Sequence, residues 1–220
     1  LLHPQGVEMD GDFVYIADND HHAIQVFDRR SKTFKKLNET LDSPWDLVKA
    51  GDSIFIAAAG AHQIWGLEIP DGPLYLFAGN GTEGIVDGPL AKSSFAQPSG
   101  IAADGARTLY IADSETSAVR KIDLFAREVH TLVGQGLFDF GDRDGDWDDA
   151  LLQHPLGIDF YDGRVFVADS YNNKIKEISL NTRRIETVFG EKGSFHEPAG
   201  VAFEGERLFV ADTHSHLIRL

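Results

Sequence analysis

The residue types that could do chemistry in this chain are carboxylates and imidazoles, because it contains no cysteine. His22, His62 and His216 occupy matching places in a repeated pattern, and zinc accepts histidine nitrogens as ligands. They fall in the first, second and last copies of that pattern, too far apart to meet one ion at about 2 Å each. We therefore expect structural roles for them, with a zinc ion as the alternative.

A short linker is crowded with aspartates. Asp142, Asp144 and Asp146 alternate with other residues, as carboxylates do in calcium-binding loops. A helix-loop-helix calcium loop beginning at Asp142 would need glycine in sixth and glutamate in twelfth position, where Trp147 and Gln153 stand. A solvated acidic loop is the preferred interpretation, and a calcium ion held by these three aspartates is the alternative. No cofactor is predicted.

The lack of catalytic motifs in the sequence and its net charge argue against several function classes. The sequence has no Gly-x-Ser-x-Gly elbow, zincin helix or phosphate loop, so an enzyme is not favoured. Lysine and arginine total 20 against 35 for aspartate and glutamate, a net charge of −15 that repels nucleic acids and anionic lipids. No apolar run approaches the roughly 20 residues of a membrane span. We expect neither nucleic-acid binding nor membrane insertion, and the compartment stays open between cytoplasmic and exported.

One phrase recurs five times and organises the whole chain. It begins with a proline, usually has glycine two positions later, and ends in Ala-Asp 14 or 15 residues after the proline. The regular copies run from Pro4 to Asp18, Pro98 to Asp113, Pro155 to Asp169 and Pro198 to Asp212. In the irregular second copy Trp45 and Asp46 follow Pro44, and Ala57-Ala58 replaces Ala-Asp.

The repeat predicts a β-propeller. Each Ala-Asp closes a run rich in β-branched and aromatic residues, a turn and a further strand follow, and the first four copies add a fourth strand near 33–38, 73–79, 128–134 and 185–190. Four short antiparallel strands per copy are typical of propeller blades. We expect an all-β fold with units at 1–40, 41–80, 95–134, 152–190 and 195–220, the last incomplete, and with all the prolines on one face. A β-sandwich is the alternative.

The end of each phrase resembles the NHL repeat, in which Ala-Asp is followed by x-x-x-His-x-Ile. Asp18 with His22 and Asp212 with His216 match it, and Asp113 and Asp169 match more loosely. The stretches SPWD, FAQPSG and FDFGDRDGDWDDALLQHPLG are similar to the family of NHL repeat-containing protein 2 and its bacterial relatives. That resemblance implies a six-bladed propeller beside a thioredoxin-like domain, so a sixth blade and that domain are expected outside this sequence.

The repeat residues have predicted structural roles. We expect each repeat aspartate to accept backbone N–H groups in the turn that follows it, and the histidine four residues later to bridge turn and strand. Three basic residues, Arg120, Lys176 and Arg219, are expected simply to offset the acidic surroundings.

The irregular second copy holds the candidate binding residues. Trp45 and Asp46 stand at the start of a channel-lining strand, His62 and Trp65 are near them in sequence, and Trp147 joins them from the acidic linker. The alternative for Trp45 is packing between blades. We predict a non-enzymatic propeller that binds a protein or peptide. A metal-dependent lyase or lactone hydrolase with a cation in the channel, and a structural module for the thioredoxin-like domain, are the alternatives.

Overall fold

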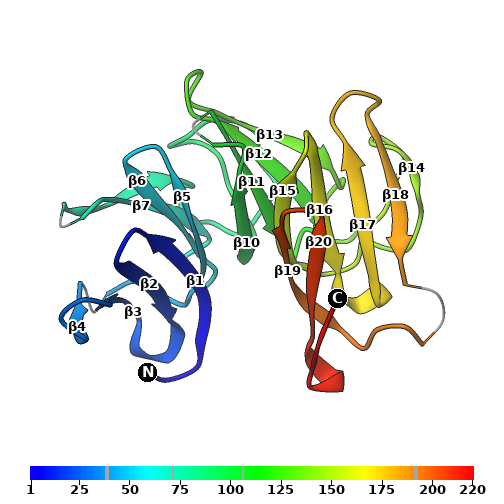
Figure 1. Ribbon diagram of the computed structural model, residues 1–220. Coiled ribbons are helices and arrows are strands. Elements are labelled where there is room, and N and C mark those ends of the chain that lie inside the picture. The colour runs from blue at the N-terminus through cyan, green and yellow to red at the C-terminus, as the bar shows by residue number, and fades with distance from the viewer. Residues whose placement is uncertain (38–39, 71, 106, 191–192) are drawn as a thin grey trace.

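Five small antiparallel sheets stand side by side as the blades of a propeller (Figure 1). The computed structural model describes residues 1–37, 40–70, 72–105, 107–190 and 193–220. The first blade is β1 (Pro4–Asp10), β2 (Phe13–Asp18), β3 (Ala23–Asp28) and β4 (Thr33–Lys36), and the second is β5 (Pro44–Ala50), β6 (Ser53–Ala58), β7 (Gln63–Glu68) and β8 (Leu74–Ala78). Asn38, at the end of the expected fourth strand, lies outside the described residues. The predicted all-β propeller is confirmed.

The remaining three blades repeat this order. The third is β10 (Pro98–Ala103), β11 (Thr108–Asp113), β12 (Ala118–Asp123) and β13 (Glu128–Val133), and the fourth is β15 (Pro155–Tyr161), β16 (Arg164–Asp169), β17 (Lys174–Ser179) and β18 (Arg184–Phe189). The fifth has three strands, β19 (Pro198–Glu204), β20 (Arg207–Asp212) and β21 (Leu217–Arg219). Three 3₁₀ turns, η1 (Asn19–His21), η2 (Ser170–Asn172) and η3 (Thr213–Ser215), follow β2, β16 and β20. No helix in the described residues has the length and apolar character needed to cross a membrane.

The repeated phrase fixes the register of the two inner strands in every blade. Its proline pairs with its last residue, as Pro4 does with Asp18 and Pro155 with Asp169, and a β-bulge follows the proline. The inner strands β1, β5, β10, β15 and β19 contact one another in that order. The five prolines therefore begin neighbouring strands at the same end of the propeller, which we call the proline face.

Two blades have a fifth strand that the sequence analysis did not predict. The linker before blade three forms β9 (Gly88–Pro89), which pairs with β13, and the linker before blade four forms β14 (Gly145–Asp146), which pairs with β18. An aspartate fixes each addition: Asp87 accepts the Thr131 N–H at 2.9 Å, and Asp144 accepts the Thr187 N–H at 2.8 Å. Each linker thus completes the outer edge of the blade that follows it.

The core lies between the facing sheets of adjacent blades. Phe55 and Ile64 of blade two pack in one cluster with Leu109 and Ile111 of blade three. Blades three and four share a second cluster, to which the linker contributes Trp147. Where two blades face each other, the apolar face of each is covered by the other, so the stability of one blade depends on its neighbour.

Glycine at the second position after the proline lets inner strands approach closely. A Cβ atom on Gly157 would lie 2.6 Å from the Cα of Gly200 and 2.7 Å from the carbonyl oxygen of Ala199, which are backbone atoms of the next blade. A Cβ on Gly200 itself would lie 3.3 Å from the Cβ of Ala211 at the nearest. A methyl group at position 157 would therefore disturb neighbouring atoms more than one at position 200.

We expect Gly157→Ala to lower the free energy of unfolding by about 1–3 kcal/mol, because the methyl group must push β15 and β19 apart. Gly200→Ala is the matched control, and its smaller expected loss reflects the more open site. Urea unfolding of both variants measures the difference. Equal losses would show that the two inner strands are not held at this close distance.

Candidate functional site

Each repeat aspartate is buried and holds the start of its own blade. Asp18, Asp113, Asp169 and Asp212 are all 0% exposed. One carboxylate oxygen accepts the N–H of the residue two positions before the blade's proline, at 2.6–2.7 Å, from Leu2, Ala96, Gln153 and His196 respectively. The expectation that these bonds come from the following turn was wrong. The antiparallel pairing of the inner strands brings the preceding segment to the carboxylate instead.

The same aspartates bind a side chain seven residues later, on the third strand. The partners are Gln25 at 2.9 Å, Arg120 at 3.0 Å, Lys176 at 3.4 Å and Arg219 at 2.6 Å. The expectation that Arg120, Lys176 and Arg219 merely offset the acidic surroundings was therefore wrong. They are specific partners, because residues seven apart lie diagonally across from each other on the same face of the second and third strands.

Blade two replaces both members of this pair. Ala58 stands at the aspartate position and Trp65 at the partner position, and the Trp65 Nε1–H donates to Gln63 Oε1 at 3.1 Å. Ala58 is 0% exposed, and Trp65 packs against the core between blades one and two. Blade two thus fills the two positions with Ala58 and Trp65 and has no buried charge there.

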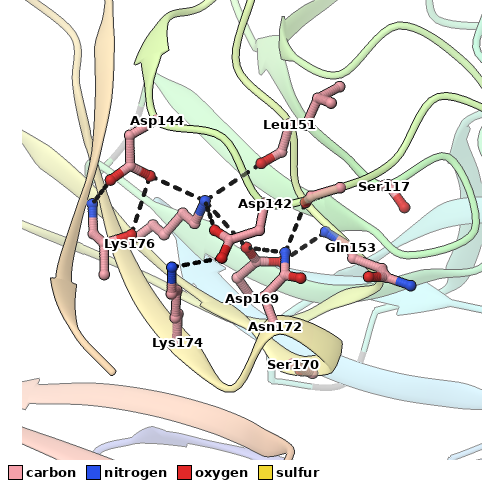
Figure 2. Close-up of polar contacts among 12 residues, drawn as sticks. Ser117, Asp142, Asp144, Leu151, Gln153, Asp169, Ser170, Asn172, Lys174 and Lys176 are labelled. Atoms are coloured by element: carbon pink, nitrogen blue, oxygen red, sulfur yellow. Dashed lines mark hydrogen bonds and ion pairs between the residues drawn. The ribbon is translucent and has the colours of Figure 1, made fainter. Parts of the chain in front are cut away.

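In blade four, linker carboxylates join the buried pair (Figure 2). The Lys176 Nζ lies 3.0 Å from Asp142, 3.0 Å from Asp144 and 3.4 Å from Asp169. Lys174 also contacts Asp142. Burial lowers the pKa of Lys176, but the three carboxylates outweigh it and leave that pKa raised. Burial also raises the pKa of Asp142 and Asp144, but Lys174 and Lys176 outweigh it at Asp142, and the Thr187 N–H together with Lys176 outweighs it at Asp144, so both pKa values are lowered.

The candidate calcium ligands therefore already bind cationic side chains. Asp142 and Asp144 contact Lys176, and Asp146 lies 2.8 Å from Arg184. Among the residues that the structure describes, no three histidine, aspartate or glutamate side chains are grouped to hold a metal ion. The carboxylates of this linker therefore neutralise the buried Lys176.

Two of the three repeat histidines, His22 and His62, lie at seams between blades, whereas His216 ends the turn η3 of blade five. His22, His62, Ser117 and Asn173 all have left-handed backbone conformations. Their side chains accept the N–H of the residue preceding the next blade's proline, from Ser43 at 3.5 Å, Gln97 at 3.1 Å, His154 at 3.2 Å and Glu197 at 2.8 Å. The residue at this position of the turn, whether histidine, serine or asparagine, therefore links its own blade to the next one.

A cavity of about 350 Å³ opens in the channel at the proline face, lined by inner strands of all five blades. The positions after the prolines form its wall, and three of them are Gly6, Gly157 and Gly200. At the equivalent place blade two supplies Asp46, preceded by Trp45. Apart from Gln5 and Ser99, the rest of the described lining is small or apolar.

Burial raises the pKa of Asp46 to about 7, and the neighbouring carboxylates Glu8 and Asp159 add to the increase. One oxygen of Asp46 accepts the Leu47 N–H at 2.9 Å, and the other accepts the Ile101 N–H of blade three at 3.1 Å. Both hydrogen bonds lower the pKa and so oppose the effect of burial. Near neutral pH this carboxyl group exchanges between a neutral and a charged form. It can therefore either donate to a ligand or attract a cation.

Asp159 makes a similar bridge at a different seam. Its Oδ2 accepts the Phe203 N–H of blade five at 2.7 Å and its Oδ1 accepts the Phe160 N–H at 2.8 Å. Burial raises the pKa of Asp159, and burial also raises that of Glu8. Carboxyl groups on inner strands thus hold adjacent blades together around the channel.

Comparison with known proteins agrees with this architecture. The model of the NHL repeat matches residues 1–27. Over 234 residues the chain is 35% identical to human NHL repeat-containing protein 2, covering 85% of this chain and 32% of that protein. The chain is an NHL-repeat β-propeller. The NHL-repeat propeller is also 38% identical over 217 residues to the Arabidopsis thaliana protein SUPPRESSOR OF QUENCHING 1, chloroplastic, covering 85% of this chain and 21% of that protein. It therefore spans only a fifth to a third of these relatives.

Solved structures share the fold of the NHL-repeat propeller at low identity. A Bacteroides thetaiotaomicron protein of unknown function has a TM-score of 0.66 at 20% identity, covering 84% of this chain and 46% of its own. Streptogramin B lyase has a TM-score of 0.66 at 13% identity, covering 97% of this chain and 66% of its own. Similarity at this level concerns the fold alone.

The NHL-repeat propeller brings only two of the sequence-predicted binding residues to the channel cavity, Trp45 and Asp46. His62 lies at the seam between blades two and three, and Trp65 lies against the neighbouring core. Trp147 is 8% exposed, with the Arg183 guanidinium 4.9 Å from its ring. The partners of the repeat aspartates were missed, although their constant seven-residue spacing was readable in the sequence.

Proposed function

We propose that this NHL-repeat propeller is a non-enzymatic binding module that takes a protein or peptide segment into the channel cavity at the proline face. The observation that supports it is the placement of Trp45 and Asp46 in the cavity wall, where other blades carry glycine or smaller side chains. An indole beside a carboxyl group provides an apolar contact and a polar anchor, a combination frequent at the centres of interfaces.

The proposal makes Trp45 the residue on which affinity depends most. Peptides selected from a displayed library on the wild-type propeller should bind the Trp45→Ala variant about tenfold more weakly, a loss of about 1.4 kcal/mol. Fluorescence anisotropy with the labelled peptides measures this change. Phe34→Ala is the matched control, since it removes an aromatic ring that is 57% exposed on β4, away from the channel. Peptides that bind the Trp45→Ala variant as tightly as the wild type would refute the channel as the site.

Two alternative functions have less support. For the metal-dependent lyase or lactone hydrolase, the described residues offer no metal-binding group, and the likeness to streptogramin B lyase concerns the fold. Metal analysis of the purified protein tests this alternative directly. A structural role beside a thioredoxin-like domain is compatible with the greater length of the relatives. Comparing the activity of that domain with and without the propeller would test it.

The surfaces beside the cavity suit the sixth blade that the family resemblance implies. Val7 of β1 is 62% exposed and Ile218 of β21 is 71% exposed, and both contribute to the cavity lining. We propose that a further blade of a longer chain covers these apolar side chains, as neighbouring blades cover each other elsewhere.

A further inference from the structure

Three exposed aromatic side chains come from two segments on the proline face that a hydrogen bond between Gly141 and Asn172 joins. Phe138 is 88% exposed, Phe140 is 54% exposed and Tyr171 is 51% exposed. The phenylalanines belong to the linker that leaves β13, and Tyr171 belongs to η2, the turn that follows β16. We call these three residues the aromatic rim.

The backbone beneath the aromatic rim is tied down. The Gly141 carbonyl accepts the Asn172 Nδ2–H at 2.7 Å, and the Gly141 N–H donates to the Leu152 carbonyl at 2.9 Å. The Tyr171 ring stacks on the His154 ring with centroids 4.4 Å apart and planes inclined by 16°. The backbone next to Phe140 and the ring of Tyr171 are therefore held in place, which lowers the entropy cost of binding at these two residues.

The fold of the linker does not require these aromatic residues. In the sister linker before blade three, Gly84 donates its N–H to the Phe95 carbonyl, as Gly141 does to Leu152. Both glycines lie three residues before the aspartate, Asp87 or Asp144, that anchors the fifth strand. At the positions of Phe138 and Phe140 the sister linker has Gly81 and Glu83. Apolar rings that are exposed and not needed for folding indicate an interaction surface.

Carboxylates lie next to the phenylalanines in sequence and near the His154 ring on which Tyr171 stacks. Asp139 is exposed between the two phenylalanines, and Glu115 lies 3.6 Å from His154 with 40% of its side chain exposed. Glu197, 43% exposed, also acts on His154. Burial nevertheless lowers the pKa of His154, so its ring is neutral at neutral pH and adds no positive charge. Aromatic faces beside carboxylates complement a planar guanidinium, which stacks and forms ion pairs at once.

We infer that the aromatic rim is a docking surface for an arginine-containing basic segment of a partner protein, separate from the channel cavity. The planar guanidinium groups stack on Phe138, Phe140 and Tyr171, while Glu115 and Asp139 supply the opposite charge. Because the chain has a net charge of −15, any polycation is attracted to it weakly, and the aromatic rim adds the specific contribution.

The test compares two labelled peptides of equal charge and length, one alternating arginine with glycine and one alternating lysine with glycine. Fluorescence anisotropy with the whole chain should show several-fold tighter binding of the arginine peptide, since lysine stacks less well on aromatic rings. The double variant Phe138→Gly/Phe140→Glu copies the sister linker and makes the chain more negative. It should nevertheless bind the arginine peptide at least about fivefold more weakly, a loss of about 1 kcal/mol.

The controls separate this surface from the channel and from general charge. Phe125→Ser removes a phenyl ring that is 89% exposed in the turn between β12 and β13, at the end opposite the proline face, and it should leave binding unchanged. Trp45→Ala should also leave it unchanged, whatever becomes of the proposed channel function. Equal affinity for the two peptides, or unchanged binding by the double variant, would overturn the inference. A loss with Trp45→Ala alone would do the same.

Discussion

Replacing Arg120 by methionine is expected to lower the free energy of unfolding by about 3–5 kcal/mol, because it leaves a buried carboxylate without its counter-charge. Arg120 and Asp113 are both 0% exposed, and one guanidinium nitrogen lies 3.0 Å from the carboxylate. A second nitrogen lies 2.8 Å from Asp87, and the Ser94 carbonyl also accepts from Arg120. Urea unfolding monitored by tryptophan fluorescence measures the loss.

Blade two suggests the control for this prediction. There an apolar pair, Ala58 and Trp65, occupies the positions of the buried ion pair. The double variant Asp113→Ala/Arg120→Met removes both charges, so it should be more stable than Arg120→Met alone. A loss below about 1 kcal/mol for Arg120→Met would place this pair among weak surface ion pairs and contradict the prediction.

The second large effect concerns the pH dependence of stability. The pKa of Asp46 is raised from its ordinary value of 3.8 to about 7 in the folded chain. Between these pH values the folded state binds more protons at this site than the unfolded state. Stability contributed by Asp46 is therefore present below about pH 4 and is lost as the pH rises through about 7, by at most about 4 kcal/mol. Asp46 is only partly buried, so screening by solvent reduces this figure.

Asp46→Asn should remove this part of the pH dependence. Urea midpoints measured from about pH 5 to about pH 8 should fall less steeply for the variant than for the wild type. Asp148→Asn, which removes a side chain that is 92% exposed, controls for the change in net charge. Parallel curves for the wild type and Asp46→Asn would show that the carboxyl group is solvated as in the unfolded chain.

The strands and the blade order could be predicted because their signal is local. The phrase from Pro4 to Asp18 contains two strands and the turn between them, so five similar phrases sufficed to recognise five blades. The position of Asp46 on a channel-lining strand followed from the same register. The prediction succeeded where the residues that decide the structure are close in the sequence.

Contacts between distant segments could not be predicted in the same way. Asp87 binds Arg120 from 33 residues away, and Asp144 reaches Lys176 from the preceding linker. Nothing local distinguishes these aspartates from a solvated acidic loop, because their partners are set by how the linker returns along the outer edge of the next blade. The raised pKa of Asp46 likewise depends first on its burial between blades and then on Glu8 and Asp159, which come from other blades.

The outer strands β9 and β14 have a consequence for protein engineering. A graft cut at Pro155 would take β15 to β18 without Asp144, and Lys176 would lose a counter-ion that its own sheet does not contain. A unit that could be moved to another propeller therefore begins before the first strand of its sheet, in the linker that contains Asp142 and Asp144. Chimaeras of such propellers should be joined before Asp142, because a junction at a sheet boundary would separate Lys176 from the linker carboxylates that bind it.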